Sequence, residues 1–261
     1  MIELTCHNIS FKYQNSLDLI LDQVNLKIFS PQSTALVGLN GSGKTTFLKL
    51  LAGILVPTEG QIYYDKKLVK NINSTKPLVT ILPENAKLFL VGPTVLDEFL
   101  KIFSSEDEVF QLLKKHNLEL LTYKKLYELS EGQRRLIALL SAFHQNKEIF
   151  LLDEPTIGLD STGRELLFDL IEKIKRDNRI IIVATNDNRI LPRLDRIIGL
   201  RNGKLLVDGT PADVLPSIYD TLGIIPNQVS RLIMDLKKIG IEIPNLTTVN
   251  ELNAYLQSLV N

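Results

Sequence analysis

The stretch GLNGSGKTT, residues 38–46, fits the phosphate-binding loop pattern G-x-x-x-x-G-K-[ST] at every fixed position. Residues 33–37 before it predict a short buried strand, and residues 47–52 after it predict a helix that ends at Gly53. Where such a loop joins a strand to a helix, backbone N–H groups and the helix N-terminus surround an anion. The sequence therefore predicts a binding site for a triphosphate.

The individual positions of this loop have separate predicted roles toward the triphosphate and its Mg²⁺. Lys44 reaches the β- and γ-phosphates, and Thr45 offers its hydroxyl to Mg²⁺. The glycines let backbone N–H groups turn inward around the anion. A chance glycine-rich turn is the alternative explanation. The expected nucleotide-binding residues of the loop are Gly38, Asn40, Gly41, Ser42, Gly43, Lys44, Thr45 and Thr46.

A second motif consists of four apolar residues, 149–152, followed by Asp153 and Glu154. The apolar run predicts a central parallel strand that is buried on both faces, and ligands bind at the carboxyl ends of such strands. Asp153 is therefore expected to hold Mg²⁺ through water, and Glu154 to face an attacking water as a base or orienter. A solvated strand end is the alternative, and the phosphate loop argues against it.

The composition indicates a globular protein with a sizeable core, since 44% of the residues are hydrophobic. No apolar run approaches the roughly 20 residues that a membrane-spanning helix needs, and the start, MIEL, lacks the features of a signal sequence. We therefore expect a cytoplasmic protein. Lysine plus arginine equals aspartate plus glutamate at 30 each, so no basic excess points to nucleic acid.

The apolar patterns predict an α/β fold of the P-loop NTPase class. Strands at residues 2–13 and 21–28, and an edge strand within residues 57–65, predict an antiparallel flank of the sheet. The buried runs 149–152 and 180–184 are joined by a helical pattern. This order predicts a mostly parallel sheet with right-handed connections.

Two helical regions accompany the predicted sheet. The first extends from about residue 94 to 145, and the second follows three prolines near the C-terminus. One face of the first region carries Leu96, Phe99, Leu100 and Phe103. One face of the second carries Val229, Leu232, Ile233 and Leu236. The expected division is an ATPase domain over residues 1–212, with a helical subdomain at about 85–145, and a small α-helical extension over 213–261.

Together these motifs resemble the ATPase subunits of ABC transporters over about residues 1–212. The stretch LSEGQ, residues 129–133, looks like the ABC signature sequence, and kinases and GTPases lack that sequence. The resemblance implies that Tyr13 stacks on the adenine, that Glu154 is the catalytic glutamate and that Asp160 contacts a second subunit. For Tyr13, an ordinary tyrosine at a strand end is the alternative.

In that family two subunits close head to tail, and each ATP lies between the phosphate loop of one subunit and the signature motif of the other. The resemblance therefore implies that Ser130 and Gly132, with the neighbouring Gln133, serve the partner's nucleotide. From the residues alone, Ser130 is expected to cap a helix, with Gln133 as its capping-box partner. The implied partners are a second ATPase subunit and separate transmembrane subunits at the inner face of the cell membrane.

The C-terminal region, residues 213–261, resembles one particular class of ABC ATPases. Residues 224–232, 238–241 and 247–252 look like the tail of the ATPases of energy-coupling-factor transporters, which import vitamins and transition-metal ions such as cobalt or nickel. Soluble ABC ATPases that act on DNA or ribosomes are the alternative class. Those proteins carry a long coiled coil or two ATPase cassettes, and this sequence has neither.

The sequence departs from the family pattern at three positions. Asn186 stands where the family usually has a histidine, and Glu131 replaces a glycine of the signature motif. Glu84 aligns with the glutamine that many members use near Mg²⁺ and the attacking water; a less favoured register would place Leu82 there. Asparagine can donate a hydrogen bond but cannot become a cation. Asn186 therefore predicts weakened hydrolysis at this chain's own site.

Weakened hydrolysis favours a heterodimer with a complete paralogue over a homodimer, because a homodimer would carry the defect at both sites. A degenerate subunit that binds ATP and regulates its partner is a further alternative. In each of these cases the expected ligands are ATP and Mg²⁺, and the expected catalytic residues are Glu154, Asn186 and Glu84.

Overall fold

The structure, a computed structural model, describes residues 1–14 and 16–260. Its larger sheet is mostly parallel, as predicted. Among the described strands of this sheet, only the hairpin strand β10 runs antiparallel to its neighbour. The strands follow the order β10 (Lys204–Gly209), β9 (Arg196–Arg201), β3 (Gln32–Val37), β8 (Ile180–Ala184), β7 (Ile149–Asp153) and β6 (Val79–Leu82). Strand β7 lies inside the sheet and is buried along its length, which confirms the sequence-based expectation.

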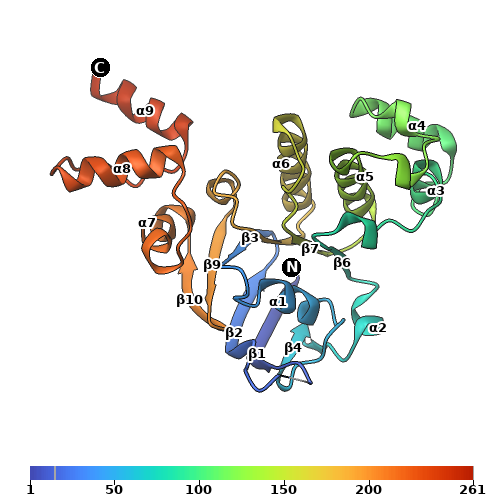
Figure 1. Ribbon diagram of the computed structural model, residues 1–261, viewed down its shortest axis with the longest axis horizontal. Coiled ribbons are helices and arrows are strands. Elements are labelled where there is room, and N and C mark those ends of the chain that lie inside the picture. The colour runs from blue at the N-terminus through green and yellow to red at the C-terminus, as the bar shows by residue number, and fades with distance from the viewer. Residues whose placement is uncertain (15, 261) are drawn as a thin grey trace.

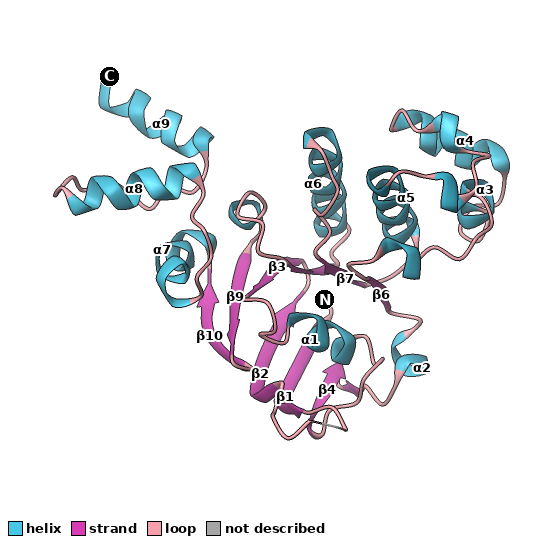
Figure 2. Ribbon diagram, viewed as in Figure 1, coloured by secondary structure: helices cyan, strands magenta, loops and turns pink. Residues whose placement is uncertain are grey.

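The predicted antiparallel flank forms a second sheet of its own (Figure 2). Its order is β2 (Leu21–Phe29), β1 (Glu3–Phe11), β4 (Glu59–Tyr64) and β5 (Lys67–Leu68). The strand that we expected at the edge, β4, is therefore interior. Asp65 and Lys66 have φ values of 46° and 65°, and this tight turn lets β5 pair with β4 and become the edge.

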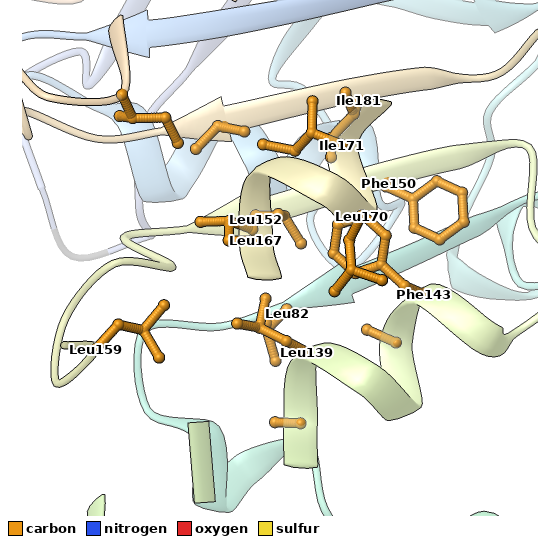
Figure 3. Close-up of a cluster of buried hydrophobic side chains, with 14 of the residues drawn as sticks. Leu82, Leu139, Phe143, Phe150, Leu152, Leu159, Leu167, Leu170, Ile171 and Ile181 are labelled. Atoms are coloured by element: carbon orange, nitrogen blue, oxygen red, sulfur yellow. The ribbon is translucent and has the colours of Figure 1, made fainter. Parts of the chain in front are cut away.

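Two apolar cores cover the two faces of the larger sheet, because successive side chains of a strand point to opposite faces. In β7, Ile149 and Leu151 pack with helix α1 (Lys44–Leu51) and the antiparallel sheet. Phe150 and Leu152 face the other core. Figure 3 shows Leu152 beside Leu167 and Leu170 of α6 (Ser161–Arg176), and Phe150 beside Phe143 of α5 (Glu131–His144).

The helical subdomain lies to one side of the sheets in Figure 1 and is built from α3 (Val95–Phe99), α4 (Glu106–Lys115) and α5. Short 3₁₀ turns at Ala86–Leu88 (η1), Glu119–Leu121 and Leu126–Glu128 connect these helices. Helix α3 ends one residue before Leu100, which is 42% exposed. The prediction that Leu100 shares the apolar face with Phe99 is therefore wrong. A further short helix, α2 (Ile72–Thr75), precedes β6.

The C-terminal region contains α7 (Pro211–Thr221), α8 (Gln228–Lys238) and α9 (Val249–Val260). Pro216 lies inside α7, and the buried Val214 and Leu215 pack α7 into the core beside β9 and β10. Helices α8 and α9 project from the core in Figure 1. On α8, Leu232 is 45% exposed, so the core covers only part of the apolar face that was predicted for this helix. None of the described helices is long and apolar enough to cross a membrane.

Candidate functional site

The phosphate loop joins β3 to α1, and α1 begins at Lys44 with Gly43 as its N-cap. Gly38, Gly41 and Gly43 have φ values of 155°, 81° and 105°. A Cβ at Gly38 would lie 2.3 Å from the carbonyl oxygen of Leu200, whereas a Cβ at Gly41 would meet nothing within 4 Å. Gly38 is therefore required for close packing, and Gly41 for its backbone conformation.

Lys44 is buried, and its Nζ donates a hydrogen bond of 2.7 Å to the carbonyl oxygen of Gly38. Burial lowers the pKa of the Lys44 ammonium, while the nearby carboxylates of Glu154, Asp153 and Glu84 oppose that shift. The structure thus brings the phosphate-loop lysine close to all three predicted carboxylates, although Glu84 and the pair Asp153–Glu154 lie far from Lys44 in the sequence.

Thr45 and Asp153, which together with Glu84 were predicted to act on Mg²⁺, lie in direct contact. The Thr45 hydroxyl donates to Oδ2 of Asp153 at 2.7 Å. Burial raises the pKa of the Asp153 carboxyl, and the Thr45 hydrogen bond opposes the rise. Glu84, in the loop after β6, lines a cavity of about 530 Å³ together with these two residues. Hydroxyl and carboxylate oxygens are the ligands that Mg²⁺ prefers.

Glu154 follows β7 with a φ of 44°, which is uncommon for a residue with a side chain. Its carboxylate accepts a 2.9 Å hydrogen bond from the hydroxyl of Thr185. Its backbone N–H donates to the Ala184 carbonyl at 2.8 Å. Burial raises the pKa of the Glu154 carboxyl, while Thr185 and Lys44 oppose the rise. A buried carboxyl with a raised pKa is suited to accepting a proton from water.

Asn186 makes two hydrogen bonds to the backbone of Gly38. Its Oδ1 accepts from the Gly38 N–H at 3.1 Å, and its Nδ2 donates to the Gly38 carbonyl at 2.8 Å. The same carbonyl also accepts from Lys44. Asn186 therefore lies at the phosphate loop, where it was expected to act, and it also holds the first glycine of that loop.

The remaining loop residues fit an anion at this place. The Ser42 hydroxyl is buried and has no hydrogen-bond partner among the described residues, so its hydroxyl hydrogen remains available to a phosphate oxygen. Thr46 is buried, and its hydroxyl lies 3.2 Å from that of Tyr13. Tyr13 is 42% exposed beside the loop. Asn40 and Gly41 are exposed at the loop tip.

The signature residues and Asp160 are used locally, at the starts of two helices. Ser130 caps α5 by accepting from the Gln133 N–H at 3.2 Å, and Gln133 Oε1 accepts from the Ser130 N–H at 3.1 Å, which confirms the capping box. Asp160 caps α6 by accepting from the Gly163 N–H at 2.7 Å. A Cβ at Gly132 would lie 2.9 Å from the Gly158 carbonyl, so the signature motif packs against the segment before α6.

Two residues at the site have roles that sequence analysis missed. Thr185 holds Glu154, and only its position directly after a buried strand could have indicated this role. Arg135 is fully buried in α5 and donates to the carbonyl oxygens of Pro83 and Glu84. An arginine within an apolar helical pattern carries no signal of that kind, because the pattern does not show what lies opposite the helix.

The sequence pattern of the family described as ABC transporter matches residues 21–157. The chain is 32% identical to energy-coupling factor transporter ATP-binding protein EcfA2 of Clostridium tetani, over 92% of this chain and 90% of that protein. The chain belongs to the ABC transporter family. Like other members of that family, it is an ATP-binding protein and an ATPase.

Two solved structures of ABC ATPases are similar to this one. The first is cbiO1 of Clostridium perfringens, part of the ABC transporter complex cbiONQ, with 26% identity and a TM-score of 0.71, covering 91% of this chain and 96% of that one. The second is the ATP-binding cassette MJ0796, a dimer bound to ADP and Pi in a post-hydrolysis state. It has 25% identity and a TM-score of 0.70, over 80% of this chain and 98% of that one.

Proposed function

We propose that this ABC ATPase is the ATP-hydrolysing subunit of an energy-coupling-factor importer, which drives uptake of a vitamin or a transition-metal ion through separate membrane subunits. Its similarity to EcfA2 and to cbiO1 supports the transporter class. The main structural observation is the contact between Thr45 and Asp153, with Lys44 and Glu154 beside them. This arrangement combines phosphate, metal and water ligands at one edge of the sheet.

In the proposed site, Lys44 and Ser42 bind the phosphates, and Tyr13 stacks on the adenine. Thr45 and Asp153, together with Glu84, would hold Mg²⁺, which would supply positive charge beside the triphosphate. Glu154 accepts the proton of the attacking water. Its hydrogen bond from Thr185 keeps the carboxylate oriented while it does so.

The proposed partner at the nucleotide is a second cassette, bound head to tail at the inner face of the cell membrane. The dimeric state of MJ0796 supports this arrangement. Ser130, Gly132 and Gln133 would then face the partner's ATP, and Asp160 would lie in the contact between the subunits. Their local capping bonds fix the two helix starts that this interface requires.

The substitution Glu154→Gln tests the proposal. The amide has the size of the carboxylate but cannot accept the proton of the water, so hydrolysis should stop while ATP binding persists. We expect ATP to stabilise a dimer of this variant in size-exclusion chromatography with light scattering. Hydrolysis at the parental rate would contradict the catalytic role. Copurification of a membrane subunit with the parent protein would support the transporter class.

One observation favours a second candidate, a subunit that binds ATP and regulates a partner while hydrolysing slowly. Asn186 is bonded to Gly38 in place of presenting an ionisable imidazole to the nucleotide. Loss of one donor that acts in the transition state costs on the order of a hundredfold in rate. We therefore propose a heterodimer in which this chain's signature motif completes the faster site of a paralogue.

A further inference from the structure

Arg135 is the largest side chain that is completely buried among the described residues, and it lies on α5 close to the Glu84 loop. Its Nη1 donates to the Pro83 carbonyl at 3.1 Å, and its Nη2 donates to the Glu84 carbonyl. Within the described part of the chain its Nε has no hydrogen-bond partner. The guanidinium thus joins α5 to two consecutive residues of the loop that follows β6.

A buried cation of this kind does not stabilise a core by itself. Removing a charge from water costs several kcal/mol, and a well-packed apolar side chain of similar size is often at least as stabilising. Burial lowers the pKa of the Arg135 guanidinium, and the carboxylates of Glu131, Glu84 and Asp153 oppose the shift. No ion pair of Arg135 is found in the described residues. Its direct hydrogen bonds go to the loop backbone, which suggests a role in holding that loop.

The neighbouring Arg134 is a natural comparison. It is also nearly buried, but it donates to the carbonyls of Leu126 and Leu129 and pairs with Glu131 at 3.1 Å. Arg134 therefore holds the segment before α5, whereas Arg135 holds the segment that carries Glu84. Adjacent arginines of one helix thus contact different loops.

We propose that Arg135 is a positioning residue that holds Glu84 in place toward Thr45 and Asp153. Glu84 lines the same cavity as those two residues, and a loop anchored at two consecutive carbonyls cannot shift without breaking buried hydrogen bonds. Because Ser130 and Gly132 begin the same helix, a movement of the signature motif would also move Arg135. This inference rests on the metal and water role proposed above for Glu84.

A double-mutant cycle tests the inference, with Arg135→Met, Glu84→Ala and both changes in the full-length protein. Methionine fills a similar length without charge or donors. Two quantities are measured: kcat at saturating MgATP, and the factor by which Mg²⁺ tightens ATP binding in calorimetry, which needs no turnover. A misplacement of about 1 Å can cost on the order of a hundredfold in rate. We expect each single change to lower kcat by about tenfold or more and to reduce the Mg²⁺ factor.

In the combined variant, kcat and the Mg²⁺ factor should be no lower than in Glu84→Ala alone, because Arg135 acts through Glu84. Arg135→Lys, which keeps a cation that can reach a carbonyl, should restore part of the loss. Arg134→Met is the matched control, and its effect should multiply with that of Glu84→Ala. If Arg135→Met does not fold, the same cycle is run with Arg135→Lys in its place. We then expect Arg135→Lys to lower kcat partially in the parent protein and to have no effect on kcat when Glu84→Ala is already present.

One result would contradict the role of Arg135, and another would contradict the role of Glu84. If Glu84→Ala lowers both quantities while the Arg135 effect multiplies with it, the inference is wrong and the role of Glu84 stands. If Glu84→Ala changes neither quantity, the proposed role of Glu84 is itself wrong.

Discussion

The backbone of Gly38 is where two functional side chains of the site meet. Lys44 and Asn186 both donate to its carbonyl oxygen, at 2.7 and 2.8 Å. A triphosphate in the loop would compete with this carbonyl for the Lys44 ammonium, and the phosphate offers the stronger, charge-assisted hydrogen bonds. Nucleotide binding is therefore expected to release one of the two bonds to Gly38.

Lys44→Ala should severely weaken ATP binding. Hydrogen bonds to charged groups contribute about 1.5–3 kcal/mol, which corresponds to a loss of affinity of about tenfold or more. Calorimetric titration with MgATP measures the change. Lys70→Ala removes an exposed lysine before α2 and should leave the affinity unchanged. An unchanged affinity in Lys44→Ala would remove the phosphate role of this loop.

The hydrogen bond from Thr185 to Glu154 predicts a pH effect. Burial raises the pKa of Glu154, and the Thr185 donor lowers it, so Thr185→Val should raise that pKa further. The base acts in its ionised form; a higher pKa therefore moves the acid limb of kcat to higher pH, with the rate recovering at pH values well above it. Thr185→Ser keeps the donor and should leave the limb in place. If the acid limb of kcat lies at the same pH in the parent and in Thr185→Val, this assignment of the base is contradicted.

At the scale of elements, parallel pairing assembles the site. Strands β3, β7 and β8 run in the same direction, so the phosphate loop, Asp153–Glu154 and Thr185–Asn186 emerge at one edge of the sheet. The loop after β6 joins them because β6 is parallel to β7. The helical subdomain is attached through this same loop, which makes the loop the connection between the catalytic edge and the subdomain.

The apolar residues 88–91, which follow Glu84, are divided by the fold. Leu88 and Val91 are each 75% exposed, whereas Leu90 is buried and Phe89 packs against the core. Exposed apolar side chains of this kind favour contact with a partner protein. We propose that the two exposed residues, on the side of the helical subdomain, contact the membrane subunits.

Site-directed crosslinking tests that contact. The one native cysteine, Cys6, is buried, so a thiol reagent will act mainly at an introduced cysteine. A photoreactive label on Leu88→Cys should crosslink to a copurified membrane subunit, and the yield should change when ATP is added. A label at the exposed Lys70→Cys is the control and should give little product. Crosslinks from Leu88→Cys to non-membrane proteins alone would count against the contact.

At the scale of the whole molecule, the main question is whether two copies of this chain would form two equivalent ATP sites. Asn186 cannot become a cation, and both the oxygen and the nitrogen of its side-chain amide are hydrogen-bonded to Gly38. Asn186→His should therefore raise the rate of ATP hydrolysis by the purified single protein, up to the order of a hundredfold. Steady-state phosphate release measures this rate. Equal rates before and after the change would remove the argument for an asymmetric heterodimer.

Asn188 connects the same region to the C-terminal helices. Asn188 lies two residues after Asn186, and its Nδ2 donates to the carbonyl of Ile225 at 2.8 Å. Ile225 lies shortly before α8. A cavity beside it is lined by Glu154, Asn186 and residues 223–225. The segment between α7 and α8 is therefore in contact with the edge of the sheet that carries Glu154 and Asn186.

Several features of this protein follow from the local order of residues along the chain. The phosphate loop, the acids after β7, the capping box of Ser130 and Gln133 and the parallel core follow from spacing and apolar periodicity over a few residues. These patterns predicted the fold class and a common Mg²⁺ role for Thr45 and Asp153, because the carboxyl ends of parallel strands meet at one edge. The direct hydrogen bond between the two side chains was not predicted.

Other features depend on contacts between residues far apart in the sequence, and these became apparent only in the folded chain. Asn186 is 148 residues from Gly38, and Arg135 is 51 residues from Glu84, so no local pattern relates either pair. No local pattern predicted the pairing of β5 with β4, which makes β4 an interior strand, or the packing of α7 on β9 and β10. Hydrogen-bond partners and packing neighbours are chosen by the folded chain, whereas periodicity reports only which side of an element is apolar.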